Sequence, residues 1–159
     1  MTLEPKILLR LQFMARVVRK ECMHLATTDQ RLFGAGFTLE QAAKLEENIE
    51  LAERVEAFVG RFSRLQDTLG DKLLPLFLVA LGEKPAAAID NLDRAERLGL
   101  LSSAEEWMVM RNLRNQMVHE YVEDPFVLLS ALQAGHAYVA VLVTTGNAML
   151  AEIERRGWA

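Results

Sequence analysis

The chain has 159 residues, of which 51% are hydrophobic and 25% are charged, and its formal net charge is −4. This length and balance indicate one globular domain over residues 1–159 and exclude a disordered chain. The negative charge excludes a general attraction to nucleic acid, so any RNA contact must come from a local patch.

Several features favour a cytoplasmic location. Cys22 is the single cysteine, which excludes an internal disulfide and fits a reducing compartment. The first twenty residues place charged side chains among apolar ones, unlike a signal peptide. The apolar run 73–81 is too short to cross a bilayer, and polar residues interrupt the segment 134–150. We therefore expect a cytoplasmic protein that makes no membrane contact.

The first half of the chain predicts two long helices. Apolar residues recur at helical spacing from about residue 4 to 32, which predicts the first helix. Thr38 and Gln41 have the spacing of a capping box, and the apolar pattern of the second helix continues from there. Gly70 and Pro75 predict a kink or break in this second helix.

The second half predicts three more segments. A short amphipathic helix covers about 86–98, and Ser103 with Glu106 forms a second capping box that opens the next helix. Asp124-Pro125 provides a cap and a first-turn proline for a long last helix. Aromatic residues, which favour strands, are few, and no segment has a convincing strand pattern. The sequence therefore predicts an all-α, up-and-down bundle of four to five helices.

Arg114 is anomalous on the helix that begins near Ser103. At 100° per residue it falls within the apolar arc, whereas Arg111, Asn115 and His119 form an adjacent stripe. A guanidinium facing a core costs several kcal/mol unless it is paired and hydrogen-bonded. The candidate partners, all near the end of the second helix, are Asp67, Asp71 and the amide of Gln66. A structural ion pair between two helices is one explanation of Arg114.

The residues from Arg114 to Tyr121 also suit phosphodiester chemistry. An arginine offers a permanent planar fork for a phosphate. A histidine such as His119 titrates near neutrality and can act as a general acid or base. Asn115 can hold the imidazole or a phosphate oxygen in place. None of these roles requires a metal or a cofactor.

The pattern Arg-Asn-x-x-x-His-x-Tyr at 114–121 resembles the signature of HEPN-domain proteins, and specifically of the HepT toxins of HepT/MNT toxin–antitoxin pairs. The likeness extends over about residues 40–155. It implies an all-helical homodimer in which two copies of the motif face each other across a cleft. It also implies a metal-independent endoribonuclease whose substrate is RNA.

The resemblance implies a role for each residue of the motif. Arg114 would contact the scissile phosphate and stabilise its transition state. His119 would be the general base or acid, and Asn115 would orient the histidine or the phosphate. Tyr121 would be the tyrosine that the MNT nucleotidyltransferase antitoxin modifies with AMP, which silences the toxin. Arg111 would add a local RNA contact.

Two other functions remain open for the same motif. The chain could be a non-catalytic subunit that binds the nucleotide or substrate of a minimal nucleotidyltransferase. It could also be a purely structural dimerisation bundle in which Arg114 ties two helices together. The two differ from the toxin in lacking RNA cleavage.

The remaining candidate residues have simpler explanations. Cys22 and His24 have no second pair to complete a zinc site, and Cys22 belongs to the apolar face of its helix. His136 lies on the apolar face of the last helix and is expected to be buried and hydrogen-bonded. Arg61 and Arg64 could join a basic patch, although solvated helix charges are the simpler expectation.

Overall fold

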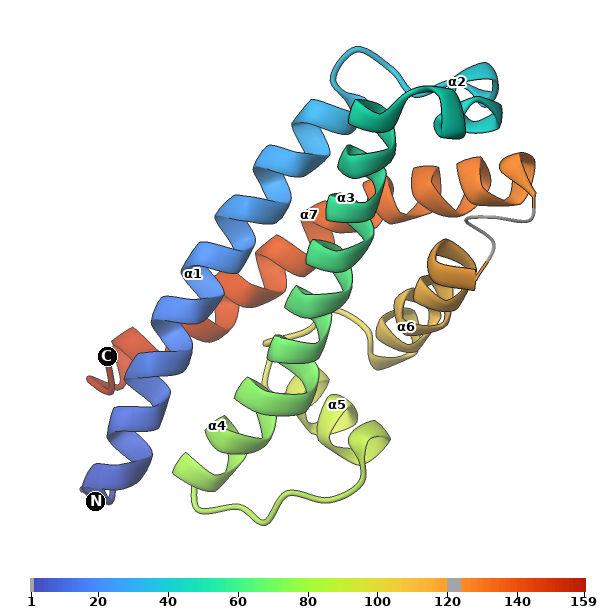
Figure 1. Ribbon diagram of the computed structural model, residues 1–159. Coiled ribbons are helices and arrows are strands. Elements are labelled where there is room, and N and C mark those ends of the chain that lie inside the picture. The colour runs from blue at the N-terminus through green and yellow to red at the C-terminus, as the bar shows by residue number, and fades with distance from the viewer. Residues whose placement is uncertain (1, 120–123) are drawn as a thin grey trace.

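The computed structural model describes residues 2–119, the side chain of His119 excepted, and residues 124–159. It is 82% helical, and no strand occurs in the described part of the chain. The helices pack together as an all-α bundle (Figure 1), which confirms the predicted fold class. The elements are α1 (Pro5–Phe33), α2 (Leu39–Ala43), the 3-10 turn η1 (Leu45–Glu47), α3 (Ile49–Asp67), the π-helical turn η2 (Thr68–Leu73), α4 (Leu74–Ala80), α5 (Ala88–Arg97), α6 (Ala104–His119) and α7 (Pro125–Arg155).

The predicted second helix begins at Thr38 but stops after one turn. The capping box forms as predicted, since Thr38 Oγ1 accepts from Gln41 N at 3.2 Å and Thr38 N donates to Gln41 Oε1 at 3.0 Å. Asn48 then provides a second N-cap, because its Oδ1 accepts from Leu51 N at 3.1 Å. The prediction of one continuous helix was therefore wrong, and α3 begins anew at Ile49.

The kink or break predicted at Gly70 and Pro75 is not a break, because a π-helical turn joins the helices on either side. The chain passes from α3 through η2 into α4 as one continuous rod (Figure 1). A Cβ at Gly70 would lie 3.1 Å from Trp107 Nε1, so the glycine lets α6 approach the rod closely. Pro75 is the second residue of α4, directly after η2, so the N–H that it lacks falls where the hydrogen-bond pattern changes from π-helical to α-helical.

The predicted caps of the second half are found, with the capping box of Ser103 and Glu106 shown in its Ser103 half. Gly99, at φ +77°, follows the end of α5. Ser103 Oγ accepts from Glu106 N at 3.0 Å at the start of α6. Asp124 Oδ1 accepts from Phe126 N at 2.9 Å at the start of α7.

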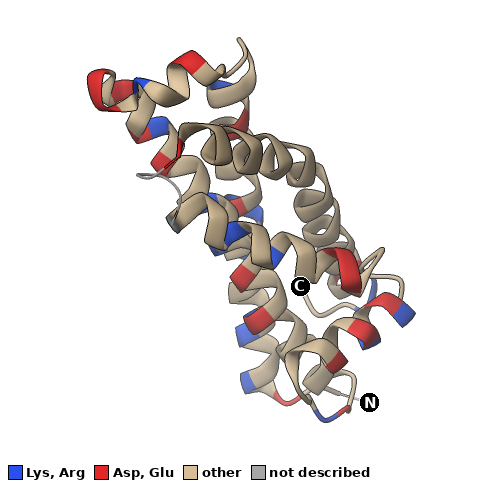
Figure 2. Cartoon of the chain, turned by 90° about the vertical axis from the view of Figure 1, so that its right-hand side faces the viewer, with Lys and Arg blue, Asp and Glu red and all other residues tan. Residues whose placement is uncertain are grey.

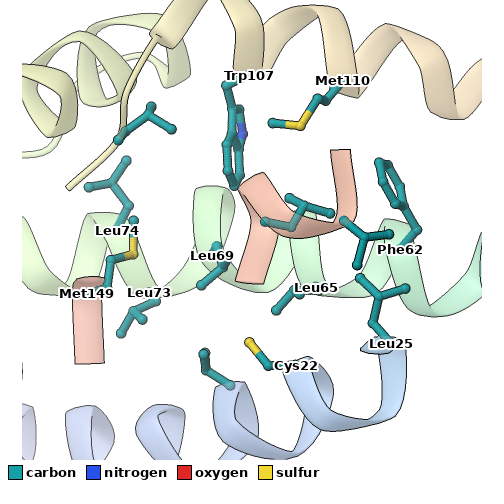
Figure 3. Packing of buried hydrophobic residues seen from close by; sticks show 14 of the residues in the cluster. Cys22, Leu25, Phe62, Leu65, Leu69, Leu73, Leu74, Trp107, Met110 and Met149 are labelled. Carbon is teal, nitrogen blue, oxygen red and sulfur yellow. The ribbon is translucent and has the colours of Figure 1, made fainter. Parts of the chain in front are cut away.

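The core lies where α1, α3 with η2, α6 and α7 meet. Figure 3 shows Cys22 of α1 and Leu69 of η2 on one side, with Trp107 and Met110 of α6 above them. Trp107 is 2% exposed and Met110 is fully buried. The buried face of α6 therefore points at the α3–η2 rod, and this orientation positions the motif residues.

The last helix, α7, is unusually apolar. Among the described residues it is the one helix long and apolar enough to cross a membrane by length and composition. Core helices of soluble proteins pass the same test, and 33% of its most apolar 18-residue stretch is buried. It carries no Asp, Glu, Lys or Arg from Pro125 to Ala151. The polar interruptions in the segment 134–150 therefore do not separate α7 from a membrane-spanning helix by composition.

Candidate functional site

Arg114 forms a two-pronged ion pair with Asp67, the last residue of α3. Its Nη1 donates to Asp67 Oδ1, and its Nη2 donates to Asp67 Oδ2 at 3.2 Å. The side chain of Arg114 is 23% exposed and that of Asp67 is 41% exposed. Asp67 is thus the partner among the three candidates. The guanidinium lies at the rim of the core, not within it.

The pairing leaves part of the guanidinium available. An arginine has five N–H donors, and the carboxylate of Asp67 takes one from each terminal nitrogen. The Nε–H and one N–H on each terminal nitrogen are outside that pair. A two-pronged pair also fixes the plane of the guanidinium more firmly than a single contact does. Arg114 is therefore a partly exposed cation in a defined orientation.

A second ion pair runs beside the first. Arg111 Nη1 lies 3.5 Å from Oδ1 of Asp71, which belongs to η2. Both side chains are about two-fifths exposed, at 39% and 42%, so this pair contributes little to stability. The third candidate, Gln66, instead donates its Nε2 to the carbonyl of Trp107 at 3.3 Å. Two arginines one helical turn apart are thus aligned with two carboxylates of the α3–η2 rod.

The π-helical turn is itself attached to α1. Thr68 Oγ1 donates to Glu21 Oε1 at 3.0 Å, immediately after Asp67 in the chain. Burial raises the pKa of Glu21, while the Thr68 hydrogen bond and the charges of Arg64 and Lys72 act in the opposite direction. Glu21 and Thr68 are not predicted from the sequence, because a separation of 47 residues gives no local signal.

The remaining motif residues are only partly placed. Asn115 is exposed, and its backbone lies one helical turn before that of His119, the last residue of α6. The side chain of His119 and the whole of Tyr121 lie outside the described residues. The structure thus brings Arg111 and Arg114 together on one side of α6 and places Asn115 on its solvent side.

Arg61 does not belong to this site. Its Nη1 donates to Thr28 Oγ1 and, at 3.3 Å, to the carbonyl of His24, both on α1. A small pocket between α1 and α3 is lined by Arg61, Arg64, Glu21 and His24. The expectation of a freely solvated charge was therefore wrong for Arg61, because α1 and α3 pack closely enough for it to bridge them.

His136 is also placed differently from the prediction. Its side chain is 48% exposed, because the buried positions of α7 run through Leu132, Gly135 and Val139. Its Nδ1 lies 2.6 Å from Asp29 Oδ1, and its ring stacks on Phe33 at 4.3 Å between centroids. The predicted hydrogen bond exists, but the predicted burial was wrong.

No described residues form a group of three or more His, Cys, Asp or Glu side chains that could hold a metal ion. Comparison with known proteins gave no match to a family model, to a curated protein or to a solved structure.

Proposed function

We propose that the protein is a metal-independent endoribonuclease and the toxin of a toxin–antitoxin pair. The proposal rests on the motif at 114–121 and its likeness to HEPN-domain toxins. The observation that carries it is the state of Arg114, a guanidinium held in one orientation by Asp67 with three N–H donors outside that pair. A fixed cation of this kind needs little reorganisation to bind a phosphate.

The proposed reaction uses three residues of α6. His119, as general base, takes the proton of a ribose 2′-hydroxyl, whose oxygen attacks the adjacent phosphorus. The bond from phosphorus to the 5′-oxygen breaks, and that oxygen takes a proton from a general acid, which His119 of the second copy would supply. The products are a 2′,3′-cyclic phosphate and a 5′-hydroxyl. Arg114 stabilises the extra negative charge of the transition state, and Asn115 orients the histidine or the phosphate.

The second copy would dock on the uncharged face formed by α6 and α7. Two shallow grooves lie on or beside this face: one of about 320 Å³ between α6 and α7, and one of about 450 Å³ between residues 99–102 and α7. None of their lining residues is charged; the central ones are Leu113, Ala134, Tyr138, Val141 and Thr144. An interface of this kind would also cover exposed apolar surface of α7, which fits a cytoplasmic protein.

Control would act through Tyr121. Tyr121 follows Arg114 by seven residues. Its modification with AMP by a nucleotidyltransferase antitoxin would add a bulky negative group that blocks the proposed phosphate site of Arg114. The proposed partners are therefore RNA, a second copy and that nucleotidyltransferase.

Cleavage of a labelled RNA in the presence of EDTA tests the proposal. We expect wild-type protein to produce cyclic phosphate ends, and Arg114→Ala and His119→Ala to reduce the rate by about 100-fold or more. Arg97→Ala is the matched control, because Arg97 is exposed at the end of α5. Equal rates for wild type and both motif variants, or no cleavage by wild type, would contradict the catalytic assignment.

The ion pairs also favour a second candidate, a structural role for Arg114. Both Arg111 and Arg114 tie α6 to the α3–η2 rod. On this reading Arg114→Ala lowers the free energy of unfolding, and wild-type protein cleaves no RNA. A protein that cleaves no RNA but binds a nucleotidyltransferase without being adenylylated would instead be the non-catalytic binding subunit.

A further inference from the structure

The outer face of α1 is a basic ridge with an apolar centre. At 100° per residue its members fall within one arc opposite the buried face: Lys6, Leu9, Arg10, Phe13, Arg16 and Lys20. Leu9 is 66% exposed and Phe13 is 55% exposed. The ridge extends over about 21 Å along the helix, from the rise of 1.5 Å per residue.

The cations of the basic ridge form no ion pair with any described residue. Lys6, Arg10, Arg16 and Lys20 take part in none of the ion pairs that the described residues form. The guanidinium of Arg16 lies over the ring of Phe13, 5.9 Å from its centroid. Charged and apolar groups thus share an exposed surface on the outside of α1, which no other described element covers.

A surface of the opposite character lies where α2, η1 and α3 meet. The acidic groove has a volume of about 360 Å³ and is lined by Ala42, Ala43, Leu45, Glu46, Ile49, Ala52, Glu53, Glu56 and Pro125. Small apolar side chains form much of its wall, and Ile49 is 72% exposed. Its three carboxylates also belong to none of the ion pairs between described residues.

The charge of the chain is segregated between these two regions. Residues 1–31 contain six Lys or Arg and three Asp or Glu, a net +3. Residues 39–56 contain two Lys or Arg and six Asp or Glu, a net −4. Figure 2 shows several red residues at the upper end of the molecule, where α2 and the start of α3 lie, and further red residues lower down, where they alternate with blue ones. The two regions are complementary in charge, and one is an exposed helix face while the other is a groove.

We infer that the basic ridge of one copy docks in the acidic groove of a second copy. A single molecule cannot make this contact, because the N-terminal half of α1 lies at the opposite end from α2 (Figure 1). Leu9 and Phe13 would enter the groove between its carboxylates, as an amphipathic helix enters an apolar groove. The contact joins two different surfaces, so it is head-to-tail and generates a ring or an open chain of copies. It does not depend on the chemistry of α6 or on the uncharged α6–α7 face.

Charge reversal on the full-length protein tests this contact. We expect Arg10→Glu/Arg16→Glu, and separately Glu53→Lys/Glu56→Lys, to weaken self-association by about tenfold or more, because like charges then face each other. The protein carrying all four substitutions restores opposite charges and should associate nearly as wild type does. The control is Arg97→Glu/Glu105→Lys, which reverses one charge of each sign elsewhere. Sedimentation at low and high salt gives the dissociation constants, and high salt should weaken the wild-type contact.

Two outcomes would overturn the inference. One is a wild-type protein that never exceeds a symmetric dimer at low salt. The other is a four-substitution protein that associates no better than its two parents, which would assign the ridge or the groove to some other partner. Neither outcome bears on RNA cleavage, so the endoribonuclease proposal and this contact fail independently.

Discussion

Arg114 links α6 to α3 through its ion pair with Asp67, and the same side chain is the proposed phosphate contact. Its pair with Asp67 is two-pronged but partly exposed, at 23% and 41% for the two side chains. Solvent screening at such exposure keeps the pair's contribution to stability modest, of the order of 1 kcal/mol. The geometry therefore matters more for orientation than for stability. A guanidinium held in this way already has a fixed side-chain conformation, so binding a phosphate would cost little further conformational entropy.

Cys22 shows how burial alone changes a side chain's chemistry. The thiol is 7% exposed, and burial raises its pKa from 9.0 to about 11, with a smaller effect from Glu21. The folded protein therefore disfavours the thiolate at any pH where the unfolded chain would begin to form it.

We expect this thiol to make stability depend on alkaline pH. Below pH 9 it is neutral in both states and its contribution is fully present. Between about pH 9 and 11 only the unfolded state gains from ionisation, so the free energy of unfolding falls by up to about 3 kcal/mol, or 1.36 kcal/mol per pKa unit. Urea unfolding at pH 8 to 11 measures this, and Cys22→Ala should lose less stability over the same range. Equal losses in both proteins would show that Cys22 does not titrate in this way.

At the scale of the helices, small residues decide how closely α7 approaches α1. Gly146 is buried in the middle of α7, and a Cβ there would lie 3.1 Å from Cys22 Sγ and 3.4 Å from Val18 Cγ1. Both neighbours belong to the buried face of α1. The glycine is therefore kept by packing, although glycine weakens a helix interior.

We expect Gly146→Ala to destabilise the protein by about 1–3 kcal/mol, because overpacking outweighs the gain in helix propensity. Gly60→Ala is the matched control, since Gly60 is exposed in α3 and a Cβ there would meet nothing within 4 Å. That substitution should stabilise by about 0.5–1 kcal/mol. Thermal unfolding of the two variants decides the matter. Equal stabilisation by both would mean that α1 and α7 can move apart at no cost.

At the scale of the whole molecule, charge and apolar surface are separated. The basic ridge and the acidic groove lie at opposite ends (Figure 1), and the grooves on α6 and α7 have no charged lining residue. These three surfaces allow one symmetric contact and one head-to-tail contact. Such a combination would build larger assemblies from dimers.

We expect the proposed symmetric contact to depend on Val141, which lines the larger uncharged groove, between residues 99–102 and α7. Val141→Lys would bring a cation into an apolar interface and should convert the dimer to a monomer. Val79→Lys on the partly exposed face of α4 is the control and should leave the dimer intact. Sedimentation at high salt, which screens the contact between ridge and groove, isolates this effect. A persistent dimer in Val141→Lys would place the symmetric interface elsewhere.

The sequence by itself determined the helical fold, most helix starts and the segregation of charge. Thr38, Ser103 and Asp124 each cap a helix where predicted, because capping depends on hydrogen bonds to backbone only two or three residues away. Apolar periodicity likewise placed Cys22 and Trp107 in the core. The catalytic roles of Asn115, His119 and Tyr121 stay predictions from the motif.

Only the tertiary structure decided which residues meet across helices. Arg114 and Asp67 are 47 residues apart, and the sequence offered two carboxylates and an amide as partners. The close approach of Trp107 of α6 to Gly70 in the π-helical turn is likewise a contact that no local pattern encodes. The exposure of His136 has the same kind of cause. It depends on which positions of α7 are buried against neighbouring helices, and His136 is not one of them. Local hydrogen bonds can be inferred from spacing along the chain, whereas these contacts depend on how whole helices rotate and pack.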